Sequence, residues 1–142
     1  MTRFFSLAVL LFCTSIGLAR AAQASIFVEV DRSEQLMRVY VEDELYYVWP
    51  VSTGRRGHTT PTGRFRPYSL RRHHRSSKYN NAPMPYSIFY RGGYAIHGTH
   101  NINRLGSPAS HGCVRLHMSN ARELFGLVQE FGKAATQIVI YP

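Results

Sequence analysis

Short apolar segments of alternating polarity, separated by turn residues, constrain this chain to a mainly β fold. Ile26, Val28 and Val30 alternate with other residues, as in a strand with one buried face. Two further apolar segments, 36–41 and 45–51, follow after short polar or acidic turns. The first third of the chain therefore predicts three consecutive antiparallel strands.

The later segments predict three more strands. Residues 87–90 and 94–97 have the pattern of a hairpin around a glycine-containing turn, and residues 137–141 predict a final strand. Residues 63–65 follow a Pro/Gly-rich turn. The polar and basic segment 69–81 predicts an exposed loop, in which adjacent histidines lie at the surface.

One segment has the periodicity of a helix. Apolar residues repeat at helical spacing between 121 and 131, and Gly132 follows where a helix would end. Asn120 and Glu123 have the spacing of a capping box. The prediction is one domain over residues 25–142, mainly β, with one substantial C-terminal helix.

The N-terminal segment has the pattern of a secretory signal peptide. Arg3 precedes the apolar run 4–18, and an A-x-A cleavage site lies at residues 22–24. A competing cleavage site lies at residues 19–21. The apolar run is short for a bilayer span, which disfavours a membrane anchor. We therefore expect a signal peptide over residues 1–24 and an exported protein of the periplasm or cell wall.

Export would leave one cysteine in the chain. Cys13 lies in the predicted signal peptide, so Cys113 would remain without a partner in an oxidising compartment. His111 lies two residues before it, and His97 lies upstream. The reactive form of cysteine is the thiolate, which a nearby imidazole favours. This pattern indicates a nucleophilic cysteine.

The residues around Cys113 have strand-like alternation. In an extended segment His111, Cys113 and Arg115 share one face, while the apolar residues between them face the core. Gly112 would let the backbone approach a substrate, and its N–H together with that of Cys113 could face a developing oxyanion. The segment therefore predicts a nucleophile, an imidazole and a cation on one rigid element.

Acidic residues are absent from Leu45 to Arg122. This excludes the paired carboxylates of a glycosidase and the usual glutamate base of a zinc hydrolase. It also removes a nearby carboxylate that could orient a histidine base. The backbone carbonyl of Gly98, directly after His97, is the simplest replacement.

A zinc site is the main chemical alternative for these side chains. Imidazole and thiolate ligands could come from His97, His100, His111, Cys113 and His117. The His-Gly-Cys spacing is tight for two ligands of one ion, and the usual paired spacings are missing. We expect neither a metal nor another cofactor.

The same acid-free span carries a strong positive charge. The formal net charge of the chain is +9. One-signed charge of this kind indicates an anionic partner. Export argues against nucleic acid, so a carboxylate-bearing cell-wall polymer fits best. The basic residues between Arg71 and Lys78 could bind such a polymer by charge.

At this point the motifs resemble a known family. The segments 96–98 (IHG) and 110–115 (SHGCVR) are similar to the signature of the L,D-transpeptidase catalytic domain. Three upstream segments resemble other recurring parts of that family in the same order: PVSTG at 50–54, TPTG at 60–63 and MPY at 84–86.

The resemblance implies a mixed, sandwich-like β fold with the cysteine in a cleft. It implies that Cys113 attacks the bond after the third residue of a peptidoglycan tetrapeptide stem, and that His97, oriented by Gly98, is the base. The thioacyl-enzyme would pass to an amine and form a 3→3 cross-link, and a carbapenem would target the same thiol. The resemblance further assigns His111 and Gly112 to the oxyanion side, Arg115 and Ser110 to the substrate carboxylates, and Tyr86 to the cleft.

Other functions stay open from the sequence. Water could replace the amine, which would make the protein an L,D-carboxypeptidase or an amidase that releases wall-linked protein. An amine of a wall-anchored protein could also be the acceptor. A non-catalytic wall-binding module is an alternative of a different class, although the intact His and Cys motif argues against it. A papain-like enzyme is disfavoured because its cysteine precedes its histidine.

Overall fold

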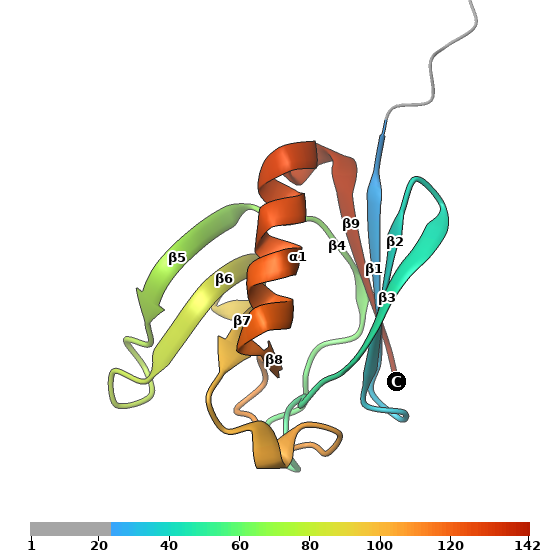
Figure 1. The fold of residues 1–142 in the computed structure, drawn as a ribbon. Helices are drawn as coiled ribbons and strands as arrows, with labels where there is room; N and C mark the ends of the chain where they lie inside the picture. Colours follow the sequence, from blue (N-terminus) through green and yellow to red (C-terminus); the bar gives the residue numbers. More distant parts are fainter. Residues whose placement is uncertain (1–23) are drawn as a thin grey trace, which may run out of the picture.

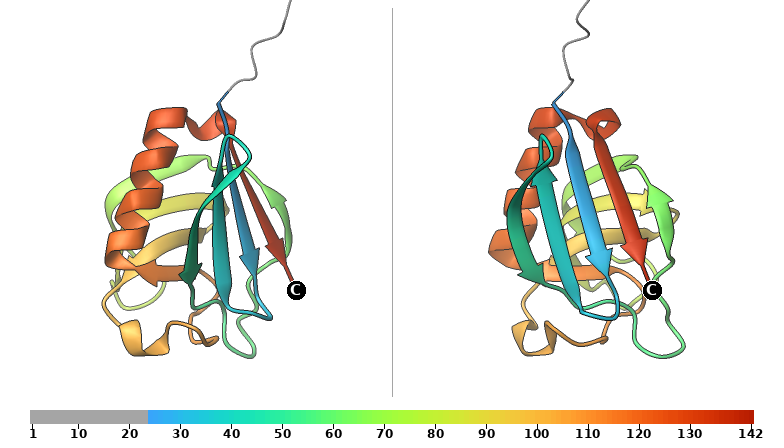
Figure 2. Two further views of the ribbon diagram at one scale, coloured as in Figure 1. Left: turned by 45° about the vertical axis from the view of Figure 1, so that its right-hand side comes forward. Right: turned by 90° about the vertical axis from the view of Figure 1, so that its right-hand side faces the viewer.

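Two β-sheets face each other across an apolar core in the computed structural model, which describes residues 24–142 (Figure 1). The predicted signal peptide lies outside these residues except for Ala24. Strands of one sheet run nearly crosswise to those of the other (Figure 2). The predicted class, mainly β with a mixed sandwich-like arrangement and one C-terminal helix, is confirmed.

The first sheet has five strands in the order β3-β2-β1-β9-β4. They are β1 (Ile26–Asp31), β2 (Leu36–Val41), β3 (Glu44–Pro50), β4 (Gly63–Phe65) and β9 (Thr136–Tyr141). All neighbours are antiparallel except β1 and β9, which are parallel. The predicted meander of three strands is therefore confirmed.

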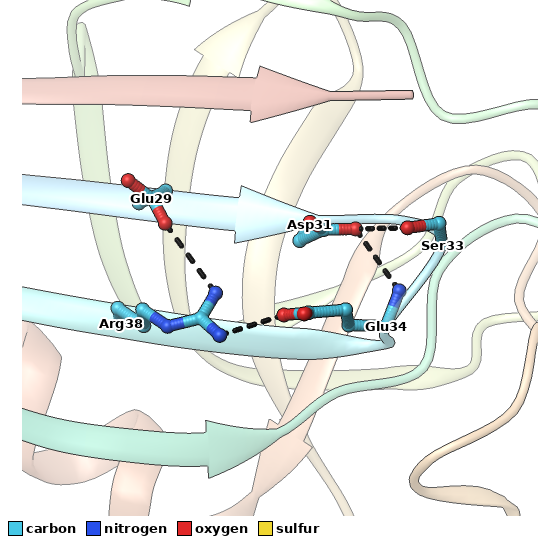
Figure 3. Close-up of polar contacts among 5 residues, drawn as sticks. All are labelled: Glu29, Asp31, Ser33, Glu34 and Arg38. Carbon is cyan, nitrogen blue, oxygen red and sulfur yellow. Dashed lines mark hydrogen bonds and ion pairs between the residues drawn. The ribbon is translucent and has the colours of Figure 1, made fainter.

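The turns of this meander follow from their residues. Glu42 and Asp43 join β2 to β3 with φ values of 51° and 68°, the left-handed backbone that a two-residue hairpin turn with positive φ at both positions needs. Asp31 closes the turn before β2 by accepting from Ser33 Oγ at 2.7 Å and from the Glu34 N–H at 2.9 Å (Figure 3). These bonds fix the register that buries Val28 and Val30.

Arg38 links β2 to its neighbours on the outer face of this sheet. Its guanidinium lies 3.4 Å from Glu29 on β1 and 2.6 Å from Glu34 (Figure 3). The three side chains are partly exposed, so solvent screens each pair and it contributes little to stability. Within residues 24–142 these are the only ion pairs.

The second sheet has four strands in the order β5-β6-β7-β8. They are β5 (Ser69–Arg75), β6 (Pro83–Arg91), β7 (Tyr94–Thr99) and β8 (Val114–His117). The predicted hairpin of residues 87–97 is the β6–β7 pair. The predicted loop over 69–81 is wrong for residues 69–75. These form the edge strand β5, whose side chains are mostly solvated, so its composition resembles that of a loop.

The helix α1 (Met118–Phe131) packs against β6, β7 and β8 on one side of the molecule (Figure 1). Its predicted end at Gly132 is confirmed, because the Gly132 N–H donates to Val128 O. The predicted capping box is wrong. His117 is the N-cap residue, and its side chain accepts from the Ser119 N–H.

Apolar side chains of both sheets and of α1 form one core. Fully buried members come from β1, β2, β7, β8 and β9 and include Val30, Met37, Ile96, Leu116 and Ile138. The helix contributes Ala121, Leu124, Phe125 and Val128. Burying a side chain of this size stabilises the fold by roughly 1.5–3 kcal/mol. This core holds β7 and β8, which carry the candidate site.

Two short 3₁₀ helices complete the structure, η1 (Ile102–Arg104) before the nucleophile segment and η2 (Lys133–Ala135) after α1. From Ala24 to the C-terminus, no helix combines the length and apolar character that a bilayer span requires.

Candidate active site

Adjacent parallel strands bring His97 and Cys113 to one face of the second sheet. Ile96 pairs with Val114 and His97 pairs with Arg115 in the β7–β8 register. Ile96 and Val114 point into the core, so His97 and Arg115 lie on the opposite face. Cys113 directly precedes β8 and shares that face. The predicted alternation of 113–116 is confirmed.

A pocket of about 460 Å³ lies over this face. Six of the predicted site residues line it: His97, Gly98, Ser110, His111, Cys113 and Arg115. No lining residue is acidic. The remaining walls come from the β5–β6 connection with the start of β6, and from the end of β7 with the residues after it. These lining residues are Ser76, Tyr79, Ala82, Pro83, Met84, Pro85, Thr99, His100 and Asn101.

His97 is buried and held by the backbone. Its ring is 5 % exposed, and its Nδ1 lies 2.8 Å from Gly98 O. A carbonyl accepts only, so Nδ1 carries the proton and Nε2 keeps its lone pair. The pKa of His97 is lowered to about 4, mainly by burial; the Gly98 hydrogen bond opposes this shift and the Arg115 charge adds to it. The ring is therefore neutral at pH 7.

Cys113 lies in mostly apolar surroundings. It packs against the cluster of Met84, Phe89 and Ala95 on the outer face of the sheet. Burial raises the pKa of the thiol, while the Ala95 N–H and the Arg115 charge oppose that rise. The resting pair is thus a neutral thiol and a neutral imidazole rather than a thiolate and an imidazolium.

Hydrogen bonds fix the turn that presents Cys113. Ser110 is fully buried, and its Oγ donates to Cys113 O at 2.5 Å and accepts from the Gly112 N–H at 3.0 Å. Thr60 Oγ1 donates to Gly112 O at 2.8 Å. Both backbone polar groups of Gly112 are therefore hydrogen-bonded inside the protein.

This turn corrects two expectations. The Gly112 N–H does not face a developing oxyanion, because it donates to Ser110 Oγ. The Ser110 hydroxyl proton is used by Cys113 O, so its hydroxyl does not offer a hydrogen bond to a substrate carboxylate. Ser110 instead holds the turn at Cys113. The Cys113 N–H makes no hydrogen bond within the described part of the chain and is the remaining local donor.

Two glycines allow this geometry. Gly112 has φ of 123°, and a Cβ there would lie 2.7 Å from Tyr94 Cε1. A Cβ on Gly98 would lie 2.8 Å from Met118 Sδ and 3.3 Å from Ala121 Cβ on α1. Gly112 thus permits the tight turn, and Gly98 permits the close approach of the helix behind His97.

The motif at residues 50–54 pairs with the nucleophile segment. Ser52 and Arg115 exchange backbone hydrogen bonds of 2.9 and 3.0 Å, and Arg55 N–H donates to Ser110 O at 3.0 Å. Both ends of the 110–115 segment are therefore tied to a second chain segment. The sequence resemblance pointed to residues 50–54 but gave them no structural role.

Arg115 supplies positive charge in the pocket. Its side chain is half-buried and has no carboxylate partner among residues 24–142. Burial lowers the pKa of Arg115, and the guanidinium stays charged at pH 7. An unpaired cation of this kind attracts an anionic group of a ligand.

Tyr86 does not line the pocket. Its φ is 55°, and its ring packs edge-on against Phe125 of α1 with centroids 5.7 Å apart. Arg72 lies over the same ring at 5.7 Å. The expected place of Tyr86 in the cleft is not supported, and its contacts are those of a sheet–helix interface.

The sequence patterns did not single out Tyr79, which lines the pocket from the β5–β6 connection. It is one tyrosine in a polar segment and carries no spacing signal. Nowhere in residues 24–142 do three or more His, Cys, Asp or Glu side chains gather as a metal site would require.

Comparison with known proteins identifies one family. The family model of the L,D-transpeptidase catalytic domain (YkuD) matches residues 25–140. The YkuD protein of Bacillus licheniformis is 27 % identical over 105 residues, which cover 71 % of this chain and 59 % of that protein. The chain therefore spans less than two thirds of the length of this curated relative.

Solved structures share the fold. An L,D-transpeptidase from Xylanimonas cellulosilytica is 28 % identical with a TM-score of 0.70, covering 85 % of this chain and 62 % of that one. The L,D-transpeptidase LdtMt1, solved in complex with imipenem, is 21 % identical with a TM-score of 0.74, covering 83 % and 59 %.

Proposed function

This chain belongs to the family of L,D-transpeptidase catalytic domains, and on that premise we propose that it is an exported cysteine L,D-transpeptidase acting on peptidoglycan stem peptides. One observation supports this most. Cys113 and the neutral imidazole of His97 line the same acid-free pocket, and the Gly98 carbonyl leaves the His97 Nε2 lone pair free.

The residues fit acylation by general-base catalysis. His97 Nε2 takes the proton of the Cys113 thiol as Sγ attacks the carbonyl carbon of the third stem residue. The Sγ–C bond forms, and the amide C–N bond to the terminal D-alanine breaks. The His97 imidazolium returns the proton to the leaving amine. The free Cys113 N–H is the local donor for the oxyanion.

Transfer of the acyl group repeats these steps in reverse. An acceptor amine attacks the thioester, loses a proton to His97, and forms a new amide as the thiol is released. With the side-chain amine of a second stem as acceptor, the product is a 3→3 cross-link. An amine of a wall-anchored protein, or water, would react by the same steps.

The charge of the pocket fits this substrate. Stem peptides carry free carboxylates, while Arg115 lies in the pocket without an acidic partner in the described chain. We assign Arg115 to a substrate carboxylate. His111 and Gly112 lie beside the proposed nucleophile. Gly112 contributes by allowing the tight turn that presents Cys113.

A carbapenem should acylate the same thiol. The imipenem complex of LdtMt1 supports this extension to the present chain. A β-lactam carbonyl would meet Cys113 as the stem carbonyl does, with ring opening in place of departure of an amine.

Product analysis tests the proposed reaction. Mature protein incubated with purified tetrapeptide muropeptides should yield 3→3 dimers and free D-alanine, resolved by liquid chromatography and mass spectrometry. Tripeptides without dimers would identify water as the acceptor. Unchanged muropeptides with wild type as with Cys113→Ala would contradict catalysis and favour a wall-binding module.

A further inference from the structure

His111 is enclosed by three side chains that the proposed reaction does not use. Its ring stacks on Tyr79 with centroids 4.2 Å apart and 11° between planes. His58 meets it edge-on at 5.1 Å. Arg55 Nη1 lies 3.1 Å from His111 Nε2. The Tyr79 and Arg55 contacts join two loops that are far apart in the sequence.

The Arg55 contact determines where the His111 proton lies. A guanidinium only donates hydrogen bonds, so His111 Nε2 must accept. The neutral ring then carries its proton on Nδ1. Arg55 Nη2 also lies 3.4 Å from His58 Nε2, so the same guanidinium contacts a second imidazole nitrogen. No carboxylate pairs with Arg55 in the described chain.

Tyr79 is itself held in place. Its N–H donates to Ser76 Oγ at 2.9 Å, and its carbonyl accepts from the Ala82 N–H at 3.0 Å. Ser76 is buried at the base of this connection. The stacked ring therefore restricts the plane of His111, while Arg55 restricts its rotation within that plane.

We propose that Arg55 and Tyr79 are positioning residues that hold His111 as a neutral Nδ1–H hydrogen-bond donor to the bound stem peptide. This inference rests on the proposed function. His111 lines the pocket with Cys113, and its Nδ1 has no partner within residues 24–142. The two histidines beside the thiol then have separate roles, because His97 presents a lone pair and His111 presents a proton.

The tautomer of His111 can be measured without any activity. Long-range ¹H–¹⁵N correlation spectra of the mature protein with ¹⁵N-labelled histidine distinguish the two neutral forms, and a His111→Asn spectrum assigns the signals. Wild type should show the Nδ1–H form. Arg55→Ala should move His111 to the Nε2–H form that free histidine prefers, while Arg55→Lys, which keeps a donor, should restore Nδ1–H.

The rate of Cys113 acylation by imipenem provides the second measurement. Arg55→Ala should lower it roughly tenfold, less than the about 10²–10³ that follows complete loss of an oxyanion donor. Tyr79→Ala should lower it similarly, and Tyr79→Phe should keep the tautomer because the ring remains. Arg56→Ala is the matched control, since Arg56 is exposed and makes none of these contacts.

The tautomer and the acylation rate distinguish a failure of this inference from a failure of the proposed function. An Nε2–H form of His111 in wild type would overturn the inference, as would an unchanged acylation rate in Arg55→Ala despite a changed tautomer. If imipenem acylates no form of the protein, the proposed function fails, and a wild-type Nδ1–H signal that Arg55→Ala abolishes would still establish the Arg55–His111 contact.

Discussion

At the scale of single residues, burial sets the protonation states of the reacting pair. On the same face of β7 and β8, the imidazole of His97 is buried and the thiol of Cys113 is partly buried. Burial lowers the pKa of the imidazole and raises that of the thiol, so both groups are neutral at rest. The proposed reaction therefore uses proton transfer to His97 during attack rather than a preformed thiolate.

The acid limb of the pH profile tests this view. His97 must be neutral to act as a base, and its pKa is about 4. The rate constant of acylation by imipenem should therefore persist as the pH falls from 7 to 5 and decline through about pH 4. A free histidine base would decline near pH 6.5. In His97→Ala the rate should be much lower at pH 7 and should rise with pH as the thiol ionises. A variant that keeps the wild-type rate and pH profile would exclude His97 as the base.

Tyr90 carries a stability prediction. Its hydroxyl is the only buried side-chain polar atom without a hydrogen-bond partner in the described residues. Such a group costs about 1–3 kcal/mol. Tyr90→Phe should therefore raise the free energy of unfolding by about 1 kcal/mol in urea titrations.

Tyr47→Phe is the matched comparison for that change. The Tyr47 hydroxyl donates to Glu123 on α1 at 2.9 Å. Its loss should lower the free energy of unfolding by about 0.5–1.5 kcal/mol. A Tyr90→Phe variant that is destabilised as much as Tyr47→Phe would show that the Tyr90 hydroxyl has a partner.

At the scale of elements, the approach of α1 to β7 depends on Gly98. Alanine there would place a methyl group 3.3 Å from Ala121 Cβ and 2.8 Å from Met118 Sδ. Met118 can move, but the helix backbone must shift as well. We expect Gly98→Ala to lower the free energy of unfolding by about 1–3 kcal/mol.

Gly126 provides the control on the same helix. It is exposed, and a Cβ there would meet nothing within 4 Å. Gly126→Ala should stabilise the protein by about 0.5–1 kcal/mol through helix propensity. Equal effects of the two substitutions on thermal unfolding would refute the packing role of Gly98.

The edge strand β5 and the connection that follows it carry exposed positive charge. Arg71, Arg75 and Lys78 are solvent-exposed, whereas Arg72 also lies over Tyr86. Replacing the first three by glutamine should weaken cosedimentation with purified sacculi, most clearly at low salt. The same replacement of Arg64, Arg122 and Lys133 removes equal charge elsewhere. Equal loss of binding for both triple variants would reject a specific role for β5.

At the scale of the whole molecule, the sequence predicted those elements whose burial follows a simple period. Strands β1 and β2 have one buried face, so their alternation is visible in the sequence. Strand β5 was missed because its side chains are largely solvated. The helix start was missed because the cap comes from His117, a residue of the preceding strand.

In the candidate site, likewise, the sequence predicted the residues of local motifs but missed contacts that depend on the folded structure. Cys113 and His97 were found from local motifs, and the lack of acidic residues pointed to the Gly98 carbonyl that His97 contacts. The role of Ser110 was predicted wrongly, because the hydrogen bonds of its hydroxyl to Cys113 O and from the Gly112 N–H depend on the conformation of the turn. Arg55 and Tyr79 reach His111 across 56 and 32 positions, and no local spacing predicts such contacts.

The most direct test of the central claim is the intact mass of the mature protein after incubation with imipenem. Wild type should gain one β-lactam mass, Cys113→Ala should gain none, and His97→Ala should acquire it far more slowly at pH 7. An adduct on Cys113→Ala, or no adduct on wild type, would contradict the assignment of Cys113 as the acylated nucleophile.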